Sequence, residues 1–196
     1  MGLTNDIIRQ KLTEKFGEQV TDFTEPYDML TFSAPKDLNL KVLNFLYDDS
    51  QLKFRFLTDI CAVHYPDQEG KELAVVYHLH NLEDNVRIRF KIFTDINQPG
   101  VYTATGLFSA ANWMERETYD FYGVNFLGHP NLKRILNVDE MDYFPMRKEF
   151  PLEDQTRVDK DDEMFGRGGT TGYGTEKTDH GTLIEADKKN VGEEIV

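Results

Sequence analysis

The chain has 196 residues, of which 35 are acidic and 22 are basic, so its formal net charge is −13. This charge disfavours nucleic acids and anionic lipid surfaces as direct partners, because both are themselves negative. The single cysteine, Cys61, excludes an internal disulfide and an iron–sulfur cluster held by this chain alone, since such clusters take about four thiolates. No apolar run approaches the roughly 18 residues of a membrane-spanning helix, and the N-terminal residues lack a secretory signal, so we expect a soluble domain that is not exported.

The N-terminal part of the chain predicts two helices with a strand between them. Apolar residues at helical spacing predict a helix over residues 5–16, which Gly17 ends. The apolar run at residues 29–34 predicts a strand. Pro35 then opens a second helix over residues 36–47, because the missing N–H of a proline in the first turn has no helical partner in any case.

Three strands are predicted next, over residues 53–65, 72–82 and 86–93, and a short polar loop at residues 81–85 joins the last two as a hairpin. With one more helix after them, this order predicts an α+β fold, in which a mainly antiparallel sheet is covered by helices on one face. The polar face of the last strand carries three basic residues in a row, Arg87, Arg89 and Lys91. They indicate either a docking face for a partner or a charged solvent face that blocks edge pairing.

The stretch around which the chain is organised begins with a predicted helix that ends at Gly123. We expect Ser109 to be its N-cap, because the hydroxyl accepts from an otherwise unpaired backbone N–H. Phe108 and Trp113 are expected to form a hydrophobic staple at the same end. The inward stripe of this helix is expected to consist of Ala110, Met114, Thr118 and Phe121.

Charged residues lie along this helix and in the segment that follows it. Glu117 falls on or beside the inward stripe, so its carboxylate needs a cationic or N–H partner, and we expect that partner to be Arg134 or another buried base. Arg116 and Asp120 are four residues apart and are expected to pair on the flank of the helix. Lys133 and Arg134 follow inside an apolar frame. Spacing alone also fits a solvated helix face with weak ion pairs, but the basic residues after it indicate an interlocked charge network.

The residue types from position 115 to position 152 carry a resemblance to one family. The pattern consists of Glu115-Arg116-Glu117, Asp120-Phe121-Tyr122, His129, Lys133, Ile135-Leu136 and the arm Phe144-Pro145-Met146-Arg147-Lys148-Glu149-Phe150-Pro151-Leu152. It resembles the signature of the respiratory complex I 30-kDa subunit family, whose bacterial members are the C subunits of NADH:quinone oxidoreductase. The sequence departs from that family at Tyr143-Phe144, where Gly-His is usual, so the resemblance does not define the local turn.

The resemblance implies a structural subunit of the peripheral arm of complex I, with no redox centre, catalytic residue or metal of its own. It implies packing against the 49-kDa partner, which shapes the quinone cavity, and a place near the subunit that carries the terminal iron–sulfur cluster. The assembled complex passes electrons from NADH through FMN and iron–sulfur clusters to quinone and translocates protons. The chain would then lie on the cytoplasmic side of the bacterial inner membrane, attached through other subunits.

The same resemblance assigns structural and interface roles to one set of residues. They are Glu115, Arg116, Glu117, Asp120, His129, Pro130, Lys133, Arg134, Arg147, Lys148, Phe150 and Pro151. All lie in the expected α+β domain, residues 1–152. Residues 153–196 are rich in acidic residues and glycine and poor in large apolar ones, so we expect an extended or disordered arm that wraps partner subunits.

Other functions stay open at the level of the sequence. The same scaffold occurs in membrane-bound hydrogenases and in the ferredoxin-dependent photosynthetic complex I, and the signature does not separate these from the NADH enzyme. A free-standing metal enzyme would use His78 and His80, which share one face of a strand, with His64 as a third ligand. A generic acidic adaptor is the third alternative. We expect Cys61 to be a buried thiol, and His129 to fix a turn and bind an adjacent carboxylate.

Overall fold

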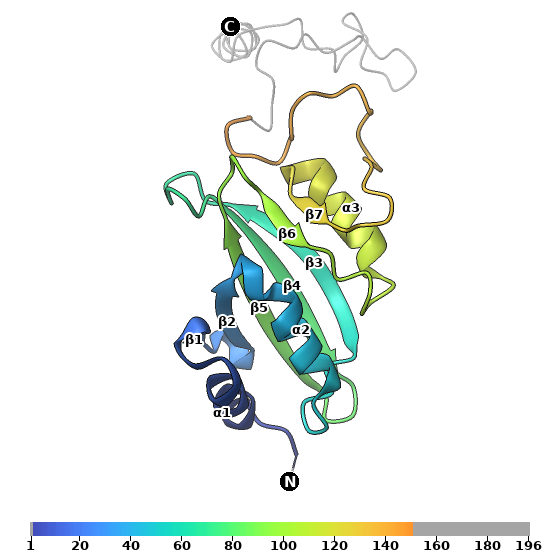
Figure 1. The fold of residues 1–196 in the computed structure, drawn as a ribbon. Coiled ribbons are helices and arrows are strands. Elements are labelled where there is room, and N and C mark those ends of the chain that lie inside the picture. Colours follow the sequence, from blue (N-terminus) through green and yellow to red (C-terminus); the bar gives the residue numbers. More distant parts are fainter. Residues whose placement is uncertain (1, 151–196) are drawn as a thin grey trace, which may run out of the picture. The chain divides into compact units, whose positions relative to one another are not determined.

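A sheet of five strands, in the order β1-β2-β5-β4-β3, forms the centre of the fold (Figure 1). The strands are β1 (Thr21–Thr24), β2 (Leu30–Pro35), β3 (Phe56–His64), β4 (Leu73–Asn81) and β5 (Val86–Thr94). The computed structural model describes residues 2–150. Pro151, the expected domain boundary at residue 152 and the arm expected at residues 153–196 lie outside the described residues.

Strands β3, β4 and β5 form an antiparallel meander, as predicted, and Asn81 closes the hairpin between the last two. The buried Oδ1 of Asn81 accepts hydrogen bonds from the backbone N–H groups of Glu83 and Asp84, at 2.8 and 3.0 Å. Its Nδ2 donates to the carbonyl oxygen of Leu52 at 2.9 Å. A side chain that copies a backbone turn in this way fixes the loop length, and with it the register of the hairpin.

Strand β2 lies parallel to β5, and this is the one parallel pair of the five-stranded sheet. Phe32 is in register with Phe90, and their rings stack at 5.1 Å between centroids. Strand β1 adds an antiparallel edge beyond β2. The sequence did not predict β1, because its four residues contain a single apolar side chain, Phe23, and therefore show no periodicity.

Helices α1 (Asn5–Phe16) and α2 (Asn39–Asp48) cover one face of the sheet, and α1 has the bounds that the sequence predicts. The 3-10 turn Lys36–Leu38 precedes α2, and two more turns span Gly17–Gln19 and Pro26–Asp28. The core between α2 and the sheet contains fully buried Val42, Leu43, Phe90 and Tyr77. No helix among residues 2–150 is long and apolar enough to cross a bilayer.

Helix α3 (Ala111–Tyr122) lies beside the edge strand β3, where Thr118 Oγ1 donates to the carbonyl oxygen of Ile60 at 3.2 Å (Figure 1). The short strand β6 (Gly100–Tyr102) precedes α3 in the sequence and β7 (Asn125–Leu127) follows it. These two strands pair in parallel with each other. Gly123 ends α3 in the left-handed conformation, as predicted.

Two expectations at the start of α3 are wrong. Ala110, not Ser109, is the N-cap, and no side chain caps the helix. The chain enters α3 through a series of backbone-bonded turns, in which the N–H of Ala111 bonds to the carbonyl of Phe108 at 3.0 Å, so the Ser109 hydroxyl is not needed. Phe108 is buried against Tyr47, whereas Trp113 is 64% exposed, so they form no staple.

Gly123 and Gly17 allow a matched test of the α3 terminus. Both have positive φ, +77° and +58°, but only at Gly123 would an added Cβ lie within 3.0 Å of other atoms, those of Phe144 and Arg147. We expect Gly123→Ala to lower the free energy of unfolding by about 2–5 kcal/mol, from backbone strain plus steric overlap. Gly17→Ala meets no steric overlap and should cost about 1–3 kcal/mol from backbone strain alone, because its φ of +58° and ψ of −134° lie outside the left-handed helical region. Urea denaturation of both variants measures the two losses, and a loss at Gly123 no larger than the left-handed strain of about 1–2 kcal/mol would show that Phe144 and Arg147 do not pack against this turn.

Candidate functional site

The C-terminal turn of α3 is enclosed by the irregular segment formed by residues 128–150. The last four carbonyl groups of an α-helix have no partner inside the helix. Here all four accept hydrogen bonds from the chain that follows. The pairs are Tyr119 with Gly123 N, Asp120 with Arg134 Nη1, Phe121 with Met146 N and Tyr122 with Arg147 Nε, at 2.8–3.2 Å. Two of the donors are guanidinium groups, and their positive charge also interacts favourably with the negative end of the helix dipole.

The carboxylate of Asp120 is the centre of this arrangement. It is fully buried and accepts five hydrogen bonds, from Arg134 Nη1, Asn137 Nδ2 and the backbone N–H groups of Ile135, Leu136 and Asn137, at 2.8–3.1 Å. Burial alone would raise the pKa of Asp120. The N–H groups of Asn137 and Leu136 and the Arg134 guanidinium outweigh burial and hold the pKa well below its usual range.

Arg134 extends the network into the rest of the segment. Its Nη2 donates to the carbonyl oxygens of Met141 and Tyr143, at 2.8 and 3.0 Å. The ring of Phe144 lies between two guanidinium groups, 5.0 Å from that of Arg134 and 4.7 Å from that of Arg147. Phe144 is one of the two residues at which the sequence departs from the family pattern, and it takes part in the network through cation–π contacts that spacing did not reveal.

Arg116 and His129 fasten the beginning of the segment to α3. Arg116 donates to the carbonyl oxygens of Lys133 and Arg134, at 3.0 and 3.1 Å, so the expected pair with Asp120 does not form. His129 Nδ1 accepts from the N–H of Asn131, which leaves the ring proton on Nε2 to donate to the carbonyl of Asn112 at 3.1 Å. His129 therefore fixes the turn as predicted, but its partner is a carbonyl and not a carboxylate.

The prediction that Glu117 pairs with a buried base is wrong. Glu117 is exposed, and the base proposed as its partner, Arg134, forms an ion pair with Asp120 at 2.8 Å. The reason is that the buried face of α3 is shifted by one residue from the inward stripe that the sequence predicts. The buried residues of α3 include Ala111, Glu115 and Thr118, which follow the helical period from 111 and not from 110.

Glu115 lies on that inward face and is fully buried. Its Oε1 accepts the N–H of Ala104 at 2.6 Å and its Oε2 accepts the hydroxyl of Thr103, so it fixes the turn that leads from β6 into α3. Burial raises the pKa of Glu115 from its ordinary value of 4.5 to about 7, against the lowering effect of these two bonds. The burial of Tyr77 and the negative charge of Glu115 raise the pKa of that phenol as well.

The remaining signature residues lie at or near the surface. Pro130, Lys133 and Lys148 are exposed or partly exposed, and the N–H of Lys148 donates to His64 Nδ1 at 2.9 Å. Phe150 contacts the ring of Tyr143 at 4.9 Å. Pro151 lies outside the described residues.

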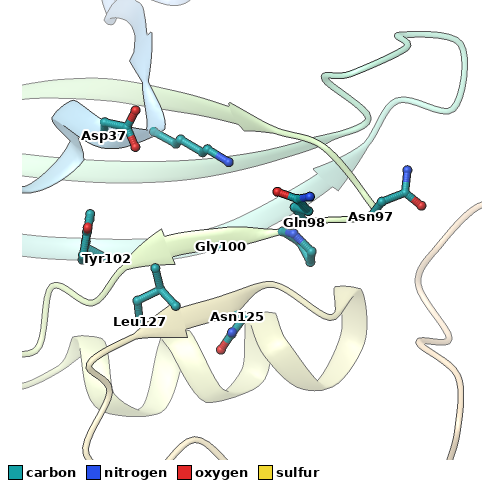
Figure 2. A pocket seen from close by; sticks show the side chains of 9 residues that line it. Asp37, Asn97, Gln98, Gly100, Tyr102, Asn125 and Leu127 are labelled. Carbon is teal, nitrogen blue, oxygen red and sulfur yellow. The ribbon is translucent and has the colours of Figure 1, made fainter.

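Exposed apolar side chains are concentrated in α3, the short strands beside it and the segment 128–150. Among the described residues, seven of the ten exposed large apolar side chains lie between positions 102 and 146: Tyr102, Trp113, Leu127, Leu136, Val138, Tyr143 and Met146. Two of them, Tyr102 and Leu127, line a cleft of about 450 Å³ beside β6 and β7 (Figure 2). The amides of Asn97, Gln98 and Asn125 and the charged side chains of Lys36 and Asp37 also line it, so the cleft offers polar groups for hydrogen bonding to a polypeptide.

The three histidines of the metal-enzyme alternative do not come together. His64 is in register with Leu73 and faces the helix-covered side of the sheet, whereas His78 and His80 face the opposite side. His80 bonds to Asn85 at 3.0 Å. The sheet alternation therefore separates His64 from the other two.

Comparison with known proteins identifies the class. The model of the respiratory-chain NADH dehydrogenase 30 Kd subunit family matches residues 32–156, and the chain belongs to this family. It is 41% identical over 155 residues to the C subunit of NADH-quinone oxidoreductase from Methylorubrum populi, covering 78% of this chain and 70% of that one. It is 41% identical over 152 residues to the C subunit numbered 1 of the same enzyme from Rhizobium meliloti, covering 78% and 75%.

Two solved structures share the fold. The trypsin-resistant fragment of Nqo5 is 28% identical with a TM-score of 0.54, and the match covers 64% of this chain and 98% of the fragment. A chain of the archaeal membrane-bound sulfane sulfur reductase is 24% identical with a TM-score of 0.63, covering 80% and 97%. The second likeness shows the fold alone.

Asp120→Asn tests the network at its centre. The variant leaves Arg134 without its counter-charge, and one amide oxygen cannot replace two carboxylate oxygens. We expect the free energy of unfolding at pH 7 to fall by about 3–5 kcal/mol in urea denaturation. Because the folded state lowers the pKa of Asp120, its contribution is present above the ordinary value of 3.8 and is lost as the pH falls below it, so the wild type should lose this stability in acid and the variant should not. Glu117→Ala, on the same helix, should change stability by no more than about 0.5 kcal/mol.

Glu115→Gln tests the buried carboxyl group. The folded state raises the pKa of Glu115, so the associated stability is fully present below pH 4.5 and is lost as the pH rises through about 7. Glutamine has no such dependence, and we expect it to gain on the order of 3 kcal/mol over the wild type between pH 5 and pH 8. Parallel stability curves for the two proteins would contradict the shifted pKa.

Proposed function

We propose that this chain is a structural subunit of the peripheral arm of complex I, where it supports the quinone-binding connecting module. It holds no catalytic residue or redox centre of its own in this proposal, and FMN, iron–sulfur clusters and quinone belong to other parts of the assembly. Its partners are other complex I subunits, chiefly the 49-kDa subunit and the subunit of the terminal iron–sulfur cluster. It is attached at the cytoplasmic side of the inner membrane through these subunits, while electron transfer is coupled to proton translocation.

The observation that carries this proposal is the rigid presentation of apolar side chains on residues 128–150. The segment forms no helix or strand, yet it is held by buried ionic and backbone bonds through Asp120 and Arg134. Leu136 and Val138 remain 67% and 64% exposed beside these anchors. Apolar side chains on a segment that is already ordered lose little entropy on binding, which suits a permanent subunit interface.

Family membership supports the same function. The two curated relatives named above, which the chain matches over 78% of its length, are both C subunits of NADH-quinone oxidoreductases. The family match covers the helix α3 and the segment after it, where the network and the exposed apolar side chains lie.

Leu136→Asp tests the interface, and Leu82→Asp is its matched control. Leu82 has nearly the same exposure, 64%, but lies in the β4–β5 hairpin, away from the network. We expect Leu136→Asp to reduce at least about tenfold the partner subunits recovered with the tagged chain from its native membranes, since interface anchors contribute about 2 kcal/mol or more. Leu82→Asp should recover them like the wild type.

Mass spectrometry of the recovered proteins separates the possible assemblies. Recovery of the 49-kDa subunit together with flavin-containing subunits supports the proposal. A nickel–iron hydrogenase subunit in their place would move the same scaffold to the alternative machine. Recovery of the partners at the wild-type level with both aspartate variants would show that Leu136 does not lie in the interface.

A further inference from the structure

The sheet face opposite α1 and α2 carries three side chains that can bind a metal ion. Asp59 and His78 are cross-strand partners on β3 and β4, and Cys61 follows Asp59 by two positions on the same face. A bulge between Leu57 and Asp59 produces this arrangement, because two residues of β3 there oppose one residue of β4. In a regular register Thr58 would oppose His78, and Asp59 would face the core.

The geometry of the three groups is close to that of a coordination site. A carboxylate oxygen of Asp59, the sulfur of Cys61 and a ring nitrogen of His78 all lie within 4.8 Å of one another. Ligand atoms around a tetrahedral zinc ion lie about 2.0–2.3 Å from the metal and so less than about 4 Å apart. All three residues are only partly buried, so rotation about their side-chain bonds is the change that the site requires.

His78 supplies a second, independent observation. Its Nδ1 is buried and has no hydrogen-bond partner among the described residues, and it lies 4.0 Å from Asp59 Oδ2. Buried polar atoms of proteins are nearly always satisfied, so this nitrogen is unusual. Without a metal its N–H has no acceptor within hydrogen-bond distance among residues 2–150, and once that proton is removed its lone pair faces a carboxylate and a thiol. Arg89 Nε donates to the other ring nitrogen, Nε2, at 3.0 Å and places the ring proton on Nδ1.

We propose that Asp59, Cys61 and His78 form a binding site for one thiophilic divalent cation of the zinc type. On binding, the Cys61 thiol releases its proton to solvent, and the ring proton of His78 moves from Nδ1 to Nε2. One thiolate and one carboxylate then balance the two positive charges of the ion, so the site is neutral. Arg89 must turn away from Nε2, because two N–H donors would otherwise face each other.

The cation would join the edge strand β3 to β4 and would stay outside redox chemistry, as expected for zinc. A nucleophilic role for Cys61 does not fit the site. Burial and the Asp59 carboxylate raise the pKa of Cys61 to about 11, so the thiol without metal is protonated at neutral pH. Coordination needs the thiolate as well, so binding of the cation should release one proton from Cys61.

Cobalt(II) binding to the purified full-length chain tests the proposal. A cobalt–thiolate bond gives a near-ultraviolet charge-transfer band, and we expect one equivalent of Co²⁺ to saturate it and Zn²⁺ to displace it. Cys61→Ser should abolish the band, and His78→Asn should weaken affinity at least about a hundredfold, the upper end of what loss of an outer partner costs. Arg89→Leu should strengthen binding, because it removes a cation and a competing donor.

His80→Asn is the matched control, since His80 lies on the same strand and the same face but outside the cluster. It should bind Co²⁺ like the wild type, and far-ultraviolet circular dichroism checks that each variant is folded. A wild-type chain without the thiolate band would overturn the proposal. Equal weakening by His78→Asn and His80→Asn would overturn it too, even if Cys61→Ser fails to fold.

Discussion

The buried carboxylate of Asp120 is the interaction on which the structure of the chain after α3 depends. Three consecutive backbone N–H groups, of Ile135, Leu136 and Asn137, converge on one of its oxygens, and Arg134 and the side chain of Asn137 bond to the other. A charge with this many donors is stable inside a protein, and it costs several kcal/mol when one partner is lost. The chain after α3 therefore takes one path although it forms no regular element.

The guanidinium groups of Arg134 and Arg147 join the end of α3 to the segment that follows it. Arg134 and Arg147 satisfy backbone carbonyls of α3 and also hold the ring of Phe144 between them. The helix terminus, the segment and the aromatic ring thus form one interlocked unit, and the exposed apolar residues Leu136 and Val138 are attached to it. Order of this kind before binding is what a permanent subunit needs, because it reduces the entropy lost on assembly.

Much of the scaffold could be predicted from the sequence, because local periodicity determines it. The bounds of α1, the β4–β5 hairpin and the stop at Gly123 follow from apolar spacing, a polar loop and a glycine. The choice between Glu117 and Asp120 could not be predicted in this way. Both lie close to the inward stripe, and only the path of residues 133–137 in three dimensions decides which carboxylate is buried.

The grouping of possible metal ligands on the sheet could not be predicted from the sequence either. Spacing on a single strand brought His78 and His80 into one metal hypothesis, but the bulge in β3 places Asp59 and Cys61 next to His78 instead. A bulge depends on pairing between strands, so one strand read alone does not reveal it. Family membership, by contrast, was visible from residue types at fixed spacing and is confirmed by the match over residues 32–156.

Amide hydrogen exchange at Ile135, Leu136 and Asn137 tests the central claim most directly. These residues lie in no helix or strand, so their amides would exchange quickly if the segment were loosely attached. If the Asp120 carboxylate binds these three amides, they should exchange as slowly as the amides in the middle of α3. The two sets of exchange rates should then change together when the free energy of unfolding is changed. Exchange at the rate of an unstructured peptide, beside a protected α3, would contradict the account.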